Sequence, residues 1–278
     1  MSAVNAVQAA PRLSVIVITR NEEPRLRACL ESLAFADECV VVDCGSSDGT
    51  VALAQRLGAR VIVTPDWPGF GRQKQRALDA ACGVWVFSID ADEWVDDVLA
   101  QAIRRVVESS VPPGEGPQQP TAYVVERLSA LCGRWMHHGS WQPDPCLRLF
   151  RRGTARFSDD LVHERLIHDG ALARLPGRLL HNSLPRLEQA LDKMNRYSSG
   201  RALDLAARGR RGGLGRAIGH GLWAFVRGYV LRRGFLDGRL GFVLALLDAE
   251  AAYYRYLKRW LDAEPVAHPL PAPRRARG

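Results

Sequence analysis

The first 110 residues alternate four predicted strands with four predicted helices, and short polar links join them. Each strand is a nearly continuous apolar run: 13–20, 37–45, 59–65 and 84–92. The helices follow at 22–34, 48–58, 71–83 and 96–109. Unbroken apolar runs are typical of strands that are buried on both faces of a parallel sheet. Regular alternation with short links therefore predicts an α/β fold in which helices flank a mostly parallel, Rossmann-like sheet.

A Pro/Gly-rich segment, VPPGEGPQQP at 111–120, interrupts this alternation and is expected to be a loop or a boundary. A mixed region follows it, and then three amphipathic stretches that predict a C-terminal helical extension. These stretches cover 186–209, 214–232 and 239–260. The expected organisation is a disordered leader at 1–11, an α/β domain at 12–185 with halves 12–110 and 120–185, a helical region at 186–262, and a disordered tail at 263–278.

Composition limits the class of protein. Lys and Arg total 38 against 30 Asp and Glu, which gives a net charge of +8, and arginines are concentrated after Arg201. A basic half favours an anionic partner such as a membrane surface, a phosphorylated substrate or nucleic acid. No apolar run approaches the roughly 20 residues that span a bilayer, and we expect neither a signal peptide nor a spanning helix. The six cysteines form no CxxC pair, so neither a zinc site nor a disulfide framework is indicated.

Polar residues follow three of the predicted strands, where an open α/β sheet binds its ligands. They are Thr19, Arg20, Asn21 and Glu22 after the first strand, Asp43 and the GSSDGT turn after the second, and Asp90, Ala91 and Asp92 after the fourth. Asp43 could accept a hydrogen bond from a base or a ribose. Asp90 and Asp92 are spaced to reach a hard divalent cation, directly or through water. Such a cation would offset the negative charge of a nucleotide diphosphate.

Four of these segments resemble, in order and spacing, the nucleotide-sugar domain of the inverting family-2 glycosyltransferases, which have the GT-A fold. The segments are LSVIVITRNEE, VVVDCGSSDGT, GFGRQKQRAL and VFSIDADEW. Later segments resemble the bacterial branch that contains the lipopolysaccharide core glucosyltransferases. These are GRWMHHGSWQPDPCLRLFRR, DDLVHERL, LLHNS and RRGFLDGRLGF. The resemblance covers about residues 12–260.

The resemblance implies that Thr19, Asn21 and Glu22 line the nucleotide pocket, and that Asp43 recognises the base, commonly uracil. Many relatives carry two adjacent acids after the second strand, whereas this chain has Asp43 followed by Cys44. We therefore assign no second carboxylate to this position.

The resemblance also implies a diphosphate and metal site. Lys74 and Arg72, beside the GFG segment, would face the diphosphate. Asp92 would be the main ligand of a divalent cation, Mg²⁺ or Mn²⁺. Asp90 would contact the ribose or the metal, and His181 would complete the metal shell.

Inverting transfer requires a carboxylate on the acceptor side to take the proton of the attacking hydroxyl. We favour Glu164, because VHE occupies the place of the acidic residue in the acceptor loop of relatives. Asp144 is the second candidate, and Asp159 and Asp160 are further alternatives. His137 and His138 could shape a pocket or pack within an aromatic loop, and His163 is expected to be structural.

The sequence therefore predicts a metal-dependent hexosyltransferase that uses a nucleotide sugar, most simply UDP-glucose, and a glycolipid or oligosaccharide acceptor of the lipopolysaccharide core. Its basic C-terminal helices would contact lipid, which would place it on the inner face of the cytoplasmic membrane. The alternatives are a polyprenyl-phosphate sugar transferase on the same fold and a non-enzymatic, basic membrane- or nucleic-acid-binding protein. No nucleic-acid recognition motif with interleaved aromatic residues appears, so we expect no nucleic-acid partner.

Overall fold

The computed structural model describes residues 11–109, 120–159 and 164–263. The predicted leader (1–11) and tail (263–278) therefore lie almost wholly outside the described residues, as do most of 111–120 and the residues Asp160 and His163. The described chain divides into two compact units. Unit 1 comprises the described part of Met1–Ala130 together with Pro143–Ser183, and unit 2 comprises Leu131–Gln142 and the described residues from Leu184 onward. The predicted domain limits stay a prediction.

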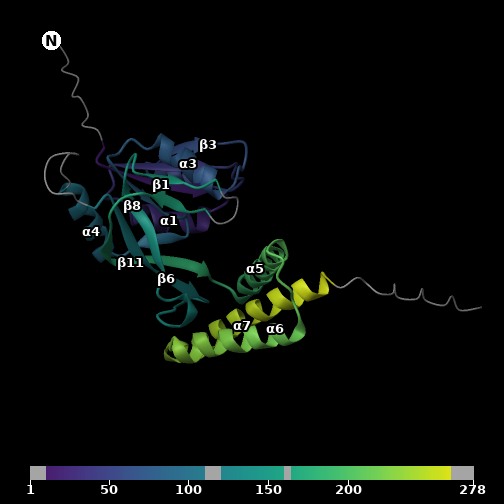
Figure 1. The fold of residues 1–278 in the computed structure, drawn as a ribbon. Helices are drawn as coiled ribbons and strands as arrows, with labels where there is room; N and C mark the ends of the chain where they lie inside the picture. Colours follow the sequence, from purple (N-terminus) through teal and green to yellow (C-terminus); the bar gives the residue numbers. More distant parts are fainter. Residues whose placement is uncertain (1–10, 110–119, 160–163, 264–278) are drawn as a thin grey trace, which may run out of the picture. The chain divides into compact units, whose positions relative to one another are not determined.

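Unit 1 begins with the predicted strand–helix alternation (Figure 1). Its elements are β1 (Leu13–Thr19), α1 (Glu23–Glu31), β2 (Glu38–Asp43), α2 (Thr50–Arg56), β3 (Arg60–Val63), α3 (Phe70–Ala80), β4 (Trp85–Ser88), β5 (Glu93–Val95) and α4 (Asp97–Glu108). The later strands are β6 (Ala122–Leu131), β8 (Pro145–Arg151), β9 (Ala155–Phe157), β10 (Leu166–His168) and β11 (Leu172–Leu184). The α/β fold class is confirmed.

The main sheet follows the order β3-β2-β1-β4-β8-β6-β11-β5. The first four strands in this order are parallel, which agrees with their unbroken apolar sequences. Strand β8 then pairs antiparallel with both β4 and β6, and β11 pairs antiparallel with β5. The sheet is therefore mixed: a parallel N-terminal half continues into antiparallel strands from later in the chain.

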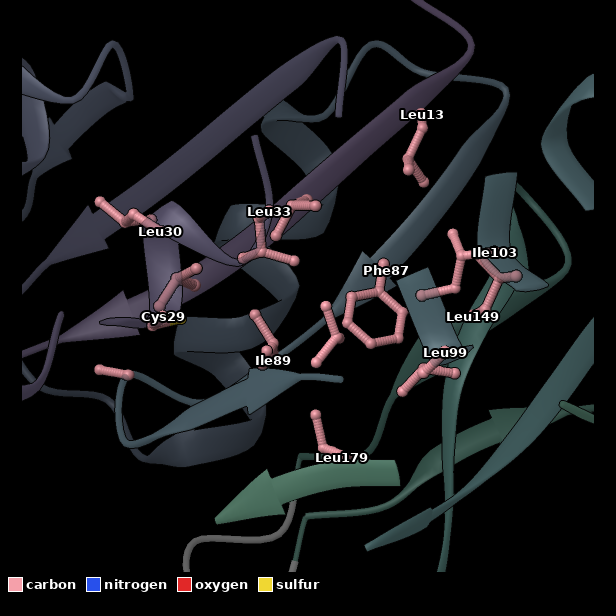
Figure 2. Close-up of a cluster of buried hydrophobic side chains, with 14 of the residues drawn as sticks. Leu13, Cys29, Leu30, Leu33, Phe87, Ile89, Leu99, Ile103, Leu149 and Leu179 are labelled. Atoms are coloured by element: carbon pink, nitrogen blue, oxygen red, sulfur yellow. The ribbon is translucent and has the colours of Figure 1, made fainter. Parts of the chain in front are cut away.

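Helices cover both faces of the parallel half. Alternate residues of a strand point to opposite faces, so the strands contribute side chains to a separate buried cluster on each face. Trp85 and Phe87 belong to one buried cluster, whereas Val86 belongs to another. Residues of α1, α2 and α4 pack in the first cluster, and residues of α3 pack in the second. Figure 2 shows the first cluster, with Phe87 lying among side chains from α1, α4 and the neighbouring strands. This two-sided core leaves the strand ends as the natural place for polar chemistry.

Unit 2 is largely helical and contains three long helices (Figure 1). Its elements are β7 (Arg134–Trp135), the 3₁₀ turn η1 (Gly139–Trp141), α5 (Leu187–Ala207), α6 (Leu214–Phe225), the π-helical turn η2 (Val226–Leu231), the 3₁₀ turn η3 (Gly234–Asp237) and α7 (Gly238–Leu261). Helix α7 packs against both α5 and α6. Gly221 allows α6 to lie close to α7, because a Cβ there would lie only 3.3 Å from the Ala249 carbonyl oxygen of α7. Within the described residues, no helix is both long enough and apolar enough to span a membrane.

Candidate active site

The carboxyl ends of β1, β2 and β4 meet at one edge of the sheet, because the three strands are parallel neighbours. Thr19, the last residue of β1, lies opposite Asp43, the last residue of β2. One residue, Ile89, separates the end of β4 from the acidic DAD segment, Asp90 to Asp92. The structure therefore places the three predicted strand-end groups on a common edge, all within unit 1.

Asp43 is fully buried and points into its own loop. Its Oδ1 accepts hydrogen bonds from the backbone N–H groups of Gly45 (3.0 Å) and Ser46 (2.8 Å). Its Oδ2 accepts from the hydroxyls of Thr19 (2.9 Å) and Ser46. In this conformation the carboxylate orders the GSS turn, and recognition of a base by Asp43 stays a prediction.

The loop after β1 is bound to the same turn through Asn21. Asn21 has a left-handed backbone with a φ of 56°, a conformation that Asn tolerates better than most residues. Its Oδ1 accepts from the Ser47 N–H at 2.8 Å, and its own N–H donates to the Ser46 hydroxyl at 2.8 Å. Glu22 pairs instead with Arg25, whose Nε lies 2.8 Å from Oε2, while burial raises the pKa of Glu22. The predicted nucleotide-pocket residues thus lie on two loops that support each other.

Asp90 is held by two cations. The Lys74 ammonium lies 2.8 Å from Oδ1, and a terminal nitrogen of Arg148 lies 3.0 Å from Oδ2. Burial by itself raises the pKa of Asp90, but the positive charges of Lys74 and Arg148 outweigh it and hold the pKa well below its ordinary value. Asp90 is therefore a fixed, ionised carboxylate whose charge is already balanced by protein groups.

Asp92 faces His181 across the site, with 3.4 Å between Oδ2 and Nε2. The other ring nitrogen of His181 is hydrogen-bonded to the Ser129 hydroxyl at 3.0 Å, so the ring orientation is fixed. Strand β11 carries His181 opposite Glu93, and the Asn182 N–H donates to the Asp92 carbonyl at 3.1 Å. Burial raises the pKa of Asp92, but its interaction with His181 is the main opposing cause, and the net pKa is lowered.

The side-chain atoms of Asp92 and His181 are of the kinds that bind a divalent cation. A carboxylate oxygen and an imidazole nitrogen face each other, and the second nitrogen of the ring is hydrogen-bonded to Ser129, which orients the ring as an outer partner does for a metal-ligating histidine. Among the described residues, no group of three or more His, Cys, Asp or Glu side chains is arranged to hold a metal. Two protein ligands suit a cation such as Mg²⁺, which takes its remaining ligands from substrate phosphates and water. Asp92 and His181 would hold it, whereas both oxygens of Asp90 are engaged by cations.

Both candidate bases make ion pairs. Glu164 Oε1 lies 2.8 Å from the Lys74 ammonium, and Asp144 Oδ2 lies 2.8 Å from Arg127 Nε. Arg72 was predicted to face the diphosphate; it is exposed, its Nε lies 3.5 Å from the exposed Asp159, and its role stays a prediction. The structure therefore brings Glu164, Lys74 and Asp90 together and leaves Arg72 at the surface.

Three charged residues at the centre of the site, Glu93, Arg127 and Arg148, were not among the predicted site residues. Glu93 is fully buried and accepts from the Asp90 N–H at 3.0 Å, from Arg148 at 2.8 Å and from Arg127 at 3.2 Å. Together with the predicted groups they form a chain of alternating charge, here called the ion chain. Its members, in order of contact, are Glu164, Lys74, Asp90, Arg148, Glu93, Arg127 and Asp144. The sequence signal for Arg148 is a lone arginine in the apolar run CLRLF, a position where a charge needs a buried partner.

The histidine pair of the HHGSW segment belongs to unit 2. His138 Nδ1 lies 2.8 Å from Asp237 Oδ1, and the His138 N–H donates to Asp237 Oδ2 at 2.8 Å. Asp237 comes from the RRGFLDGRLGF segment, so this segment and the HHGSW segment meet in one contact. This contact ties η1 to η3 within the helical unit.

Comparison with known proteins identifies the family. The family model described as Glycosyl transferase family 2 matches residues 14–110. An uncharacterised glycosyltransferase of Rickettsia typhi is 31% identical over 257 residues, which is 89% of this chain and 86% of that protein. The lipopolysaccharide core biosynthesis glycosyltransferase LpsC of Rhizobium meliloti is 31% identical over 258 residues, which is 88% of this chain and 93% of that protein.

Among solved structures, the mannosyltransferase PcManGT from Pyrobaculum calidifontis, in complex with GDP-Man and Mn²⁺, has a similar fold. The TM-score is 0.52 at 18% identity, and the match covers 92% of this chain and 89% of that one. The resemblance inferred from the quoted segments is thus confirmed at the level of family and fold. With relatives of 31% identity aligned over most of both sequences, the chain belongs to glycosyltransferase family 2 and is a glycosyltransferase.

Proposed function

We propose that this glycosyltransferase moves a hexose, with inversion, from a UDP-sugar to the lipopolysaccharide core or another glycolipid. The observation that carries the proposal is the arrangement at one sheet edge: Asp92 faces His181, and Glu164 is held beside Asp90 through Lys74. One end of this arrangement suits a cation with a diphosphate, and the other end suits proton removal. Similarity to LpsC, a lipopolysaccharide core biosynthesis glycosyltransferase, supports a lipopolysaccharide core acceptor.

The proposed reaction is a single displacement at the anomeric carbon. Glu164 takes the proton of the acceptor hydroxyl, whose oxygen attacks the anomeric carbon from the face opposite the nucleotide. The bond between that carbon and the diphosphate oxygen breaks, and the electron pair leaves with the UDP. A divalent cation at Asp92 and His181, when bound, would stabilise the negative charge on the departing diphosphate. Asp144 is the second candidate for the base. It pairs with Arg127 at the end of the ion chain opposite to Glu164.

A panel of nucleotide sugars tests the donor and the metal together. A ligand at about 100 times its dissociation constant stabilises a protein by about 2.7 kcal/mol, which corresponds to about 5–11 °C in Tm for a protein of this size. We expect such a shift with UDP-hexoses only when Mg²⁺ or Mn²⁺ is present, and no shift for Asp92→Ala. Absence of any shift across UDP- and GDP-sugars, combined with salt-sensitive binding of nucleic acid or lipid alone, would favour the non-enzymatic basic protein.

The acceptor is tested separately with radiolabelled donor. Transfer to a truncated lipopolysaccharide core is expected. Transfer to polyprenyl phosphate alone would replace this proposal with the polyprenyl-phosphate sugar transferase.

Contact with the membrane surface is the remaining part of the proposal, and α6 with η2 supports it. Exposed apolar side chains recur at every fourth position along this segment: Leu214, Ile218, Leu222, Val226 and Val230. Exposed arginines, Arg216 and Arg227, lie on the same segment. An apolar stripe flanked by cations is the pattern of a helix that rests in the headgroup region of anionic lipid. With a glycolipid acceptor and a nucleotide-sugar donor, the location we propose is the inner face of the cytoplasmic membrane.

Vesicle sedimentation tests this contact. Phosphatidylcholine vesicles with phosphatidylglycerol should bind the protein more strongly than phosphatidylcholine vesicles alone. Leu222→Glu should weaken binding to both, whereas Leu172→Glu, an exposed leucine of unit 1, should leave binding unchanged. Equal binding of the two variants would remove α6 as the contact.

A further inference from the structure

Phe157, Ser158 and Glu164 all lie against the first turns of α3. The Gln75 side chain accepts from the Phe157 N–H at 2.9 Å, and the Lys74 ammonium lies 2.8 Å from Glu164. Gly71 lies so close that a Cβ there would be 1.9 Å from the Ser158 carbonyl oxygen and 3.4 Å from the Glu164 Cβ. Three residues of one helix, Gly71, Lys74 and Gln75, therefore pack against the candidate base and the residues before it.

Lys74 is the centre of this arrangement, and its surroundings differ from those of a diphosphate ligand. Only 6% of its surface is exposed, and its ammonium contacts two carboxylates at 2.8 Å, Asp90 and Glu164. A buried ammonium between two carboxylates is already neutralised and hydrogen-bonded, so little of its charge is left for a third anion. Arg72, two residues before Lys74 in α3, is an exposed cation at the start of this helix.

The second oxygen of Asp90 accepts from Arg148, which also contacts Glu93. Asp90 is thus fixed from the far side, and Lys74 in turn is fixed against Asp90. The position of Glu164 follows from a rigid support, which is what precise placement of a reacting group requires.

We propose that Lys74 is a positioning residue for Glu164 and that it does not bind the donor diphosphate. The proposal rests on the function proposed above, in which Glu164 takes the acceptor proton. Its consequence is a separation of effects: loss of Lys74 lowers kcat through Glu164 and leaves donor binding nearly unchanged. A diphosphate ligand would show the opposite separation.

The first experiment measures kcat, donor KM and the Kd of UDP with Mg²⁺ by calorimetry for Lys74→Met and Lys74→Arg. A base contributes about 10²–10⁴-fold and a misplacement of about 1 Å costs about 10²-fold, so kcat of Lys74→Met should fall by about 10²-fold. The UDP Kd should stay within about threefold of the wild-type value, and Lys74→Arg should regain part of kcat. A tenfold or greater weakening of UDP binding with little change in kcat would overturn the proposal.

A double-mutant cycle distinguishes action through Glu164 from a general structural role. Glu164→Gln alone should lower kcat to a similar extent. Adding Lys74→Met to Glu164→Gln should then cost no more than about twofold, because the group that Lys74 positions is already gone. Losses that multiply would show that Lys74 acts independently of Glu164 and would refute the proposal.

Gly71→Ala supplies a test that keeps every charge. The new methyl group must displace the Ser158 backbone, and Glu164 with it, so kcat should fall while the UDP Kd is retained. Gly200→Ala is the matched control, because its Cβ would meet nothing within 4 Å, and its kinetics should equal those of the wild type. Normal kcat in a folded Gly71→Ala variant would contradict the positioning of Glu164 by α3. Wild-type protein that binds no UDP would instead count against the proposed function, so the two failures are distinguishable.

Discussion

Replacing Arg148 with methionine tests whether the ion chain stabilises unit 1. Arg148 lies on β8, and its terminal nitrogen is 3.0 Å from Asp90 and 2.8 Å from Glu93. Burial opposes the guanidinium charge, but Glu93 and Asp90 outweigh it and raise the pKa of Arg148. Methionine has a similar length and no charge. The change therefore leaves Glu93, which is fully buried, with Arg127 at 3.2 Å as its remaining charged partner in the ion chain.

Removing one partner of a buried ion pair costs about 3–5 kcal/mol, because the other charge stays buried without compensation. Lys74 and Arg127 still hold the two carboxylates, so we expect the lower end, about 3 kcal/mol. That is a large fraction of the total free energy of unfolding of a domain, about 5–15 kcal/mol. The corresponding fall in Tm is about 6–12 °C for a protein of this size.

Urea unfolding followed by circular dichroism measures the effect, provided that several probes give one coincident transition. Arg27→Met is the control, because its pair with Glu31 at 3.2 Å is exposed and is worth no more than about 0.5 kcal/mol. The double variant Arg148→Met/Glu93→Gln removes one charge of each sign and should recover most of the lost free energy. A single variant within about 1 kcal/mol of the wild type, or a double variant no more stable than the single one, would refute the reasoning.

Three further predictions follow from burial and packing. The lowered pKa of Asp90 means that its contribution to stability is complete above the unfolded value of about 3.9 and is lost as pH falls below it. Urea midpoints between about pH 3 and 7 should therefore fall steeply at the acid end in the wild type and less steeply in Asp90→Asn. Burial and then the nearby Glu38 charge raise the pKa of Cys39 to about 12, so a disulfide reagent at pH 8 should modify the exposed Cys82 first, and Cys82→Ser should remove the fast phase. In unit 2, a Cβ at position 241 would lie 1.8 Å from the Gly234 carbonyl oxygen, so Gly241→Ala should lower the Tm by several degrees in a thermal melt.

The parallel half of the sheet could be predicted from the sequence because its information is local. Strand β1 and its neighbours are short apolar runs, each bounded by a turn signal and followed by an amphipathic helix. The same local reading placed Asp90 and Asp92 at the end of a strand, where the structure has them. Short-range patterns suffice here because consecutive elements pack next to each other.

The ion chain could not be predicted, because its contacts depend on strands that are distant in sequence. Strand β8 inserts between β4 and β6, with Phe87 opposite Leu149, and this register brings Arg148 to the end of β4. No local pattern specifies that insertion or its register. The inward turn of Asp43 was likewise hidden, since a buried carboxylate with four hydrogen bonds and a ligand-binding carboxylate look the same in sequence.

The distribution of charge explains why a core strand can end in three acids. Asp90 and Glu93 are both balanced by members of the ion chain at 3.2 Å or less. Asp92 differs, since its described partners lie farther away, His181 at 3.4 Å and Arg25 at 3.7 Å. Asp92 is therefore the acid of this cluster that the protein holds least closely, and it lies on the side where His181 offers a nitrogen. An incoming cation would meet one available carboxylate there, while the acids on either side stay fixed by the protein.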